Sequence, residues 1–150
     1  MDLQLMTTLE KKELAWQPST PKDVLRELAK DKYYVVRFNV ASNPNIPKDT
    51  LTALLRDPAL IVRIHVVNNP NIPVDILRKL AKDRSFLIRR RVAKHPNTPK
   101  DALQDLAQDE DWRVRWNMAM NPNSSIISLV TLLEYERSFT EPRRDIITAL

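Results

Sequence analysis

The sequence predicts an all-α protein, an α-helical solenoid of about five repeats with two short helices in each. A 26-residue segment recurs four times in register without insertion or deletion, at residues 17–42, 43–68, 69–94 and 95–120. Each copy holds two stretches whose apolar residues recur at helical spacing. A helix pair this short cannot bury its own apolar face, so neighbouring repeats are expected to stack into one continuous core.

The first helix of each repeat is expected to begin at a proline, because the missing N–H of proline costs nothing at the first helical position. An aspartate follows two residues later, where an acid suits the positive end of the helix dipole. Leu25, Leu28 and Ala29 then give the i, i+3, i+4 spacing of a buried face. The prolines are Pro21, Pro47, Pro73 and Pro99, and the aspartates are Asp23, Asp49, Asp75 and Asp101.

The second helix is predicted at about residues 34–42, 60–68, 86–94 and 112–120. Each copy stops at an Asn-Pro or His-Pro pair, since the proline cannot continue the helix. The chain has no glycine, so asparagine is expected to take the left-handed conformation that ends many helices. These last residues are Asn43, Asn69, His95 and Asn121.

The two ends depart from the pattern, as capping repeats do. Residues 1–16 are predicted to form an N-terminal capping helix, because Leu14 and Ala15 stand in the places of Val40 and Ala41. Residues 17–120 are the four regular repeats, and residues 121–150 form a divergent C-terminal capping repeat. We therefore expect a single domain over residues 1–150.

One arginine recurs in the middle of the inward arc of each second helix. An unpaired charge there would be very costly, so each guanidinium needs an anionic partner. An aspartate that recurs just before each second helix is the obvious partner. The sequence thus predicts a structural ladder that joins repeats, with a ligand-binding role for the arginines as the alternative. Its members are Asp31, Arg37, Asp57, Arg63, Asp83, Arg89, Asp109 and Arg115.

The positions that vary between repeats are the better candidates for function, because the constant positions build the scaffold. On the second helices these positions carry aromatic, aliphatic and basic residues on a face expected to be partly wet. Such an apolar strip indicates an interaction surface, or else packing at the borders between repeats. The candidate partner-binding residues are Val35, Phe38, Asn39, Ile61, Ile64, His65, Leu87, Arg90, Arg91, Lys94, Arg113, Trp116, Asn117 and Met120.

Positive charge is concentrated in one repeat. Residues 69–94 contain eight Lys or Arg against two Asp, whereas the whole chain carries a net charge of +5. Arg90, Arg91 and Lys94 would form a local basic patch, which does not suit an extended duplex with its many phosphate contacts. The patch is compatible with an acidic peptide or helix, a phosphate-bearing ligand or a short nucleic-acid contact, or it is a solvated charged face.

Catalytic and cofactor chemistry find no support in the sequence. The chain has no cysteine and no glycine, which removes thiolate metal sites, cysteine nucleophiles, phosphate-binding loops and nucleophile elbows. His65 and His95 stand at no recognisable motif spacing. We therefore expect no enzyme activity, no cofactor and no metal, no membrane association, and a cytoplasmic location because no secretory signal opens the chain.

The recurring pattern L-x-x-L-A-x-D…V-R-x-x-V-A-x-N-P-N-x-P resembles the variant leucine-rich repeat family, a bacterial relative of HEAT and armadillo repeats. Here it reads LRELAKD…VVRFNVASNPNIP and LQDLAQD…RVRWNMAMNPNS, and it covers about residues 17–125. The resemblance implies a right-handed superhelix in which an α-helix alternates with a shorter, often 3₁₀, helix. It says little about function.

Two functions are therefore expected from the sequence. The first is a non-enzymatic scaffold that binds a protein or peptide through the second helices, the expected concave face. The alternative is a nucleic-acid-binding solenoid that uses the basic patch of residues 69–94. A weaker third idea is an accessory subunit that positions a separate enzyme.

Overall fold

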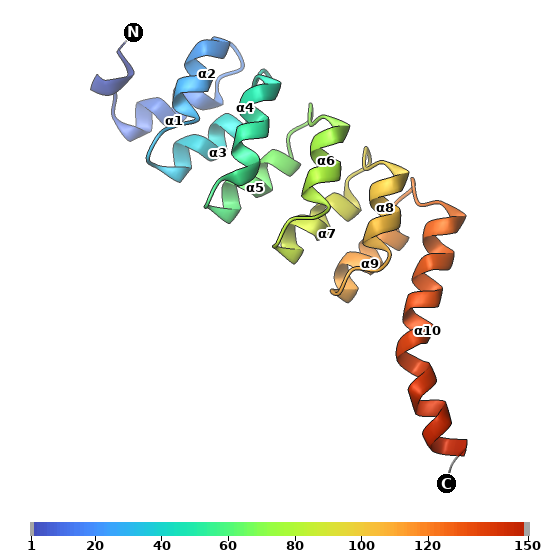
Figure 1. Cartoon of the computed structure of the whole chain (residues 1–150). Coiled ribbons are helices and arrows are strands. Elements are labelled where there is room, and N and C mark those ends of the chain that lie inside the picture. Colours follow the sequence, from blue (N-terminus) through green and yellow to red (C-terminus); the bar gives the residue numbers. More distant parts are fainter. Residues whose placement is uncertain (1, 149–150) are drawn as a thin grey trace. The chain divides into compact units, whose positions relative to one another are not determined.

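The computed structural model describes the backbone of residues 2–148 and the side chains of residues 2–138. All regular structure in this part of the chain is helical (Figure 1). In chain order the elements are η1 (Leu3–Leu5), α1 (Thr8–Trp16), α2 (Lys22–Leu28), α3 (Tyr34–Ser42), α4 (Lys48–Ala53), η2 (Leu54–Arg56), α5 (Leu60–Val67), α6 (Val74–Leu80), α7 (Phe86–Lys94), α8 (Lys100–Leu106), α9 (Trp112–Ala119) and α10 (Ile126–Thr148). The chain forms two compact units, residues 1–76 and residues 77–150.

In the N-terminal unit the second helices lie side by side. Helix α3 packs against α1 on one side and α5 on the other, and α2 contacts both α1 and α3. The helices bury the apolar residues that recur with the repeat. The buried set includes Ala15, Leu25, Leu28, Val36, Val40, Ala41, Leu51, Leu54, Val62 and Val66.

The C-terminal unit repeats this arrangement. Helix α7 packs against α9, α8 contacts both of them, and α10 packs against α8 and α9. The same positions of the repeat are buried here: Leu80, Ile88, Val92, Ala93, Leu103, Leu106, Ala107, Val114 and Met118. The predicted α-solenoid of two-helix repeats is therefore confirmed within each unit.

The second helix of each regular repeat is an α-helix of eight or nine residues rather than a 3₁₀ helix. The first helices are also α-helical, although α4 ends in the 3₁₀ turn η2 just before Asp57 and Pro58. The alternation with 3₁₀ helices that the family resemblance implies is thus not followed here. No helix among the described residues is long and apolar enough to cross a membrane.

The expectation that asparagine ends the second helices in a left-handed conformation is wrong. No residue of the described backbone has a positive φ, and Asn43 is extended, with φ −67° and ψ 127°. The extended backbone suits the asparagine because its side-chain amide then reaches two carbonyl oxygens of the preceding repeat. Nδ2 of Asn43 donates to the carbonyls of Ala15 and Gln17, at 2.8 Å each.

Helix α10 differs from the other first helices in length. Those helices have six or seven residues, whereas α10 has 23 and continues through the positions where a second helix would follow. Consequently no separate second helix completes the fifth repeat within the described residues. A capping role for residues 121–150 stays a prediction.

Candidate functional site

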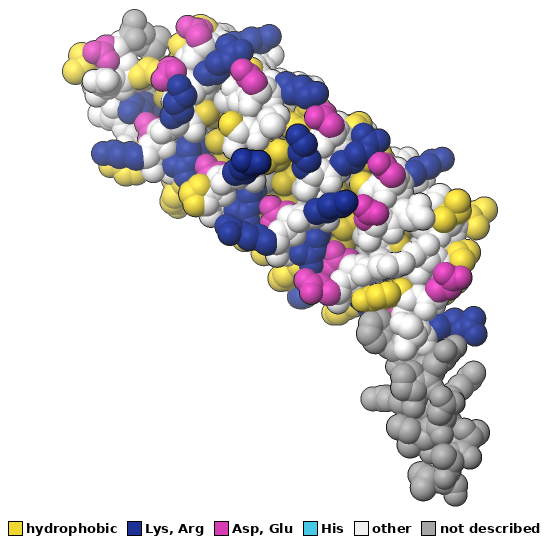
Figure 2. Space-filling model, viewed as in Figure 1, with side chains coloured by type: hydrophobic (Ala, Val, Ile, Leu, Met, Phe, Trp, Pro, Cys, Tyr) yellow, Lys and Arg dark blue, Asp and Glu magenta, His cyan; other side chains and the backbone are white. Residues whose placement is uncertain are grey.

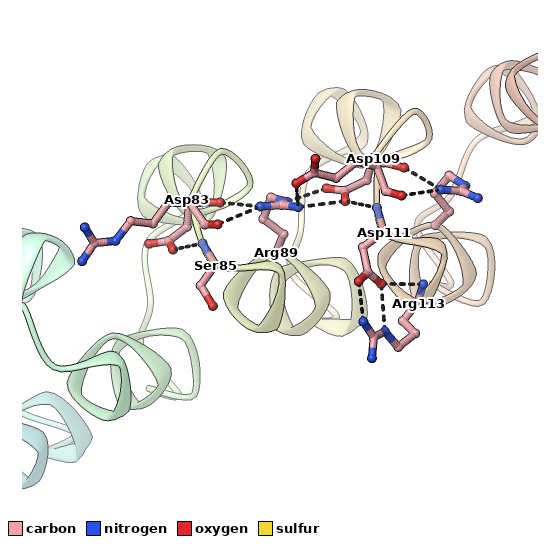
Figure 3. A network of polar contacts seen from close by, with 9 residues as sticks. Asp83, Ser85, Arg89, Asp109, Asp111 and Arg113 are labelled. Carbon is pink, nitrogen blue, oxygen red and sulfur yellow. Dashed lines mark hydrogen bonds and ion pairs between the residues drawn. The ribbon is translucent and has the colours of Figure 1, made fainter.

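Two of the recurring arginines, Arg37 and Arg89, bind an aspartate of the following repeat. Arg37 Nε and Nη2 donate to the two carboxylate oxygens of Asp57, at 2.6 and 3.0 Å. Arg89 binds Asp109 in the same bidentate way, at 2.6 and 3.1 Å (Figure 3). Nη1 of Arg37 also donates to the backbone carbonyl of Asp31 in its own repeat. Each pair therefore ties two successive repeats together through largely buried side chains.

At both ends of the chain a different residue fills the pairing position. Lys11 of α1 donates to Asp31 at 2.9 Å, where the regular repeats use an arginine. At the other end Arg115 donates to Glu136 at 2.6 Å, because Tyr135 stands where the other repeats have aspartate. Arg63 and Asp83 complete the recurring set; Arg63 Nη1 donates to the carbonyl of Asp57, and an Asp83 oxygen accepts from Ser85 N.

The hydrogen bonds of Arg89 account for every donor of its side chain. A guanidinium has five N–H groups. In Arg89 they go to both oxygens of Asp109, to Glu110 and to the carbonyls of Asp83 and Arg84. The hydrogen bond to Asp109 raises the pKa of Arg89. This arginine therefore has no free donor for a phosphate or a carboxylate ligand.

Asp31 is held in its ionised form by neighbouring donors. Burial raises the pKa of the carboxyl, but hydrogen bonds from Tyr33 N and from Lys11 outweigh that effect and lower it overall. The pKa of Arg37 is raised, chiefly by its hydrogen bond to Asp57. Asp31 and Arg37 therefore both stay charged at neutral pH, as is required if their ion pairs connect the repeats.

A second ladder, made of asparagines, was not anticipated from the sequence. Asn69 Nδ2 donates to the carbonyls of Ala41 and Asn43 in the preceding repeat, and its Oδ1 accepts from Asn71 N. Asn121 makes the same three bonds, to Ala93, His95 and Asn123. The recurring N-P-N pattern is the sequence feature that could have predicted this ladder. The asparagine side chains of the pattern bind carbonyls of the preceding repeat and do not simply cap the next helix.

In the N-terminal unit the candidate binding residues contact one another. Phe38 stacks on the ring of His65, with centroids 4.7 Å apart, and His65 Nδ1 lies 2.6 Å from Ser42 Oγ. Val35 and Ile64 are half-buried and Ile61 is exposed. Asn39 is buried and donates to the carbonyl of Val35, so it is not available to a partner on the surface.

In the C-terminal unit three cations of α7 have no partner among the side chains that the structure describes. Arg91 and Lys94 are exposed and Arg90 is half-buried. None of the three makes a side-chain ion pair or hydrogen bond within the described residues. Leu87, in the same helix, is half-buried. These side chains leave a positive charge on the second-helix face that nothing in the described part of the chain neutralises.

The candidate residues of α9 divide into paired and unpaired ones. Arg113 binds Asp111 through two contacts, of 2.6 and 3.0 Å, and these lower the pKa of Asp111 to about 2. The Arg113 guanidinium also lies 4.3 Å from the ring centre of Phe86. Asn117 donates to the carbonyl of Arg113. Trp116 and Met120 are largely exposed, as is Trp112, which the sequence-based set omits.

The first helices present a mixed, self-neutralising surface. Arg26 pairs with Asp49 and Lys48 with Asp75 in the N-terminal unit, and Figure 2 shows such basic and acidic side chains intermingled. An open groove of about 410 Å³ lies between α2 and α4, and one of about 540 Å³ includes residues of α8. Because similar grooves recur between neighbouring first helices, they follow from the stacking of the repeats.

Metal-ion chemistry has no visible basis in the described side chains. No group of three or more histidine or carboxylate residues among them is placed to hold a metal ion. The two histidines serve local contacts, since His65 stacks on Phe38 and His95 Nδ1 accepts from Asn97 N at 3.1 Å.

Comparison with known proteins supports the resemblance seen in the sequence. The family model described as "Leucine rich repeat variant" matches residues 34–59, the length of one repeat. A solved structure described as a leucine-rich repeat variant with a novel repetitive structural motif is similar, with 23% identity and a TM-score of 0.50. The match covers 82% of this chain and 59% of the solved chain, so this chain spans less than two thirds of that protein. No curated protein matches.

Proposed function

We infer that this α-solenoid, one repeat of which matches the leucine rich repeat variant model, is a non-enzymatic binding scaffold that recognises a protein or peptide in the cytoplasm. Repeat solenoids expose long faces that commonly serve as binding surfaces. The face that we propose is the one formed by the second helices. It carries the residues that vary from repeat to repeat, and it is chemically unlike the self-neutralising first-helix surface.

The observation that carries this proposal is the set of unpaired cations Arg90, Arg91 and Lys94 on α7. Elsewhere in the same unit Arg78 pairs with Asp101, Lys82 with Asp105 and Arg89 with Asp109. A helix with three cations that no described side chain pairs creates a local positive potential that attracts anionic groups. Beside α7, helix α9 adds exposed apolar surface.

This combination fits an acidic peptide or helix that also carries apolar side chains. Carboxylates would pair with the arginines, which offer planar, bidentate recognition. Apolar residues of the partner would cover the half-buried Leu87 and its neighbours. Charge would then set the orientation and the association rate, and the apolar contacts would supply most of the affinity.

The test is a pull-down from lysate with and without nuclease, comparing the wild type with the double variant Arg90→Glu, Arg91→Glu. The matched control is Lys79→Glu, Lys100→Glu, which makes the same change in charge with exposed lysines of the first helices. A discrete protein that survives nuclease, stays bound to the control and is lost by the arginine variant supports the proposal. Equal retention by both variants contradicts it.

A second candidate function is short nucleic-acid binding, favoured by the same three cations and the net charge of +5. Binding that rests on phosphate contacts weakens steeply with salt, by about one decade in affinity per decade in salt for each contact made. Fluorescence anisotropy of a labelled single strand, measured at several salt concentrations, gives that slope. A slope near zero, or equal binding by the arginine variant, rules this function out.

A further inference from the structure

We propose that the cations of α7 form a phosphate site, and that the partner peptide binds there through a phosphorylated side chain. The site consists of Arg90, Arg91 and Lys94 of α7 together with Asn117 of α9, here called the α7–α9 junction. This inference rests on the proposed function, because it names the anionic group through which the partner is held on that face.

Contacts in the N-terminal unit show which positions of successive second helices meet. Phe38 of α3 stacks on the ring of His65 of α5, and Ser42 Oγ of α3 lies 2.6 Å from His65 Nδ1. Two side chains one turn apart on α3 thus converge on one side chain of α5. Each of these positions has a counterpart two repeats later, on α7 and α9. The counterparts of Phe38, Ser42 and His65 are Arg90, Lys94 and Asn117.

Helices α7 and α9 keep the register of α3 and α5. The bidentate pair of Arg89 with Asp109 repeats that of Arg37 with Asp57, and the shorter contact is 2.6 Å in each pair. Helix α7 also packs against α9 as α3 packs against α5. The three counterparts on α7 and α9 therefore lie around one junction, as the three residues of the N-terminal unit do.

Only one second helix of the four regular repeats carries cations at these positions. The position of Arg90 is Phe, Ile or Trp in the other three repeats, and the positions of Arg91 and Lys94 hold no lysine or arginine there. The scaffold therefore does not require the charges. Lys94 follows Arg90 by four residues and Arg91 by three, and like charges at these spacings repel each other on a helix surface. An anion bound between them removes this repulsion.

The acids at the start of α9 are already bound to other arginines. Asp109 and Glu110 pair with Arg89, and Asp111 pairs with Arg113. Among the side chains that the structure describes, no carboxylate pairs with a cation of the junction, although one of these cations is half-buried. The charge complement of the junction is therefore an anion from outside the described part of the chain.

A phosphoryl group suits the junction better than a carboxylate does. A phosphorylated side chain carries a charge of about −1.5 to −2 at neutral pH and three strong acceptor oxygens, whereas a carboxylate carries a single charge. The planar guanidinium of Arg90 can bind two of the oxygens, and Lys94 supplies a point charge for the third. One N–H of Asn117 Nδ2 donates to the carbonyl of Arg113, and its second N–H can serve the same oxygens.

An aliphatic side chain on the same helix extends the site. Leu87 is half-buried and lies about one turn before Arg90 and Arg91. An apolar residue of the peptide beside its phosphorylated residue would cover this leucine. Recognition would then combine a charged anchor with an apolar one, as arginine clusters do when they bind phosphorylated segments.

The probe for the test is a fluorescein-labelled peptide library with phosphoserine fixed at its centre and mixed apolar and polar residues around it. Its anisotropy is titrated with the full chain at constant ionic strength. Two matched libraries carry serine or glutamate at the centre. We expect the phosphoserine library to bind at least about tenfold more tightly than the glutamate library, because phosphate accepts additional charge-assisted hydrogen bonds.

The variant for the test is Arg90→Phe, Lys94→Ser, which introduces the side chains that the first repeat has at Phe38 and Ser42 and is therefore compatible with the fold of the repeat. We expect at least about tenfold weaker binding of the phosphoserine library to this variant. The matched control is Lys79→Ser, Lys100→Ser, which removes two positive charges from the first helices. Circular dichroism checks that all variants keep their helicity.

A preference for phosphoserine that is lost in the junction variant and kept in the control supports the proposal. Absence of binding, equal binding of the phosphoserine and glutamate libraries, or equal binding by the two variants overturns it. Two competitors distinguish other sources of phosphate. Inorganic phosphate or single-stranded DNA that binds as tightly as the phosphoserine library would overturn the assignment to a phosphorylated peptide.

Phosphatase treatment separates failure of this inference from failure of the proposed function. The pull-down with the wild type and the Arg90→Glu, Arg91→Glu variant is repeated with lysate treated with phosphatase. A partner that the wild type captures equally from treated and untreated lysate overturns the phosphate site and leaves the proposed function standing. A partner whose capture is unaffected by the arginine variant contradicts the proposed function itself.

Discussion

Arg89 of α7 and Asp109, twenty residues further along the chain, form a bidentate ion pair in which both carboxylate oxygens accept N–H groups, at 2.6 and 3.1 Å. The same guanidinium donates to two carbonyls of its own repeat (Figure 3). One side chain thus closes the loop before its own helix and also binds the next repeat. Because all its donors are used, a structural role accounts for the arginine fully.

Arg89→Ala is expected to lower the free energy of unfolding by about 3 kcal/mol, because it leaves the Asp109 carboxylate buried without its partner. Urea denaturation followed by circular dichroism measures this change. Arg90→Ala, at the next position of the same helix, is the control and should change stability by less than about 0.5 kcal/mol. If Arg89→Ala cost no more than the control, the pair would not hold the repeats together.

The ion pair at the C-terminal end should contribute less. Arg115 binds Glu136, whose side chain is 49% exposed, whereas that of Asp109 is 6% exposed. Solvent screens the exposed pair, so we expect Glu136→Gln to cost about 0.5 kcal/mol and Asp109→Asn about 3 kcal/mol. The same urea titration compares the two variants. A larger loss for Glu136→Gln would mean that Arg115 depends on this acid more than its exposure suggests.

The ion pairs between repeats were predictable in part, because the arginine and the aspartate recur with the same 26-residue period. An inward arginine in every repeat requires an acid, and an aspartate recurs with the same period. Periodicity alone could not tell whether Arg89 uses Asp83, six residues before it, or Asp109, twenty residues after it, because both recur identically. In the structure Arg89 binds both residues: it donates to the backbone carbonyl of Asp83 and to the carboxylate of Asp109. Such a choice depends on the stacking of repeats, which spacing does not encode.

The asparagines show where reasoning from local propensity failed. Lack of glycine led to the expectation of a left-handed Asn43, on the assumption that the residue serves its own helix end. Its side chain instead serves the preceding repeat, through two carbonyl oxygens at 2.8 Å, and this contact requires an extended backbone. A long-range hydrogen bond thus outweighed the local preference.

Asn43→Ala is accordingly expected to cost about 2 kcal/mol, because it leaves two carbonyls and the N–H of Asn45 without a partner. Asn45→Ala is the matched control. Asn45 is exposed and its amide donates to the carbonyl of Pro18 alone, so its loss should cost about 0.5 kcal/mol. Thermal unfolding of both variants checks the order. Similar losses in the two variants would show that burial of Asn43 does not matter.

The exposure of Trp112, Trp116 and Met120 on α9 could not be predicted from the sequence either. Trp116 and Met120 were recognised as apolar residues in variable positions, but whether a following helix covers them depends on where α10 ends. Because α10 is one helix of 23 residues, it leaves the neighbouring edge of α9 open. Trp112, whose counterparts are Phe86, Leu60 and Tyr34, is not among the candidate residues predicted from the sequence.

His95 should make the stability of the fold depend on pH, because it replaces the asparagine of the other repeats with a titratable side chain. Burial lowers the pKa of His95 from its ordinary value of 6.5. Well above pH 6.5 the ring is neutral in both the folded and the unfolded chain, and it adds no pH dependence. As the pH falls below that value, the unfolded chain takes up a proton before the folded chain does, so the free energy of unfolding decreases. The decrease is complete once the pH lies below the pKa of the folded state.

His95→Asn removes this titration and places at residue 95 the side chain found at Asn43, Asn69 and Asn121. The difference in unfolding free energy between variant and wild type should therefore grow in favour of the variant between about pH 7 and pH 5. Urea titrations at a series of pH values measure that difference, and carboxylates common to both proteins cancel in it. A difference that is constant over this range would mean that His95 is protonated as easily in the folded chain as in the unfolded one.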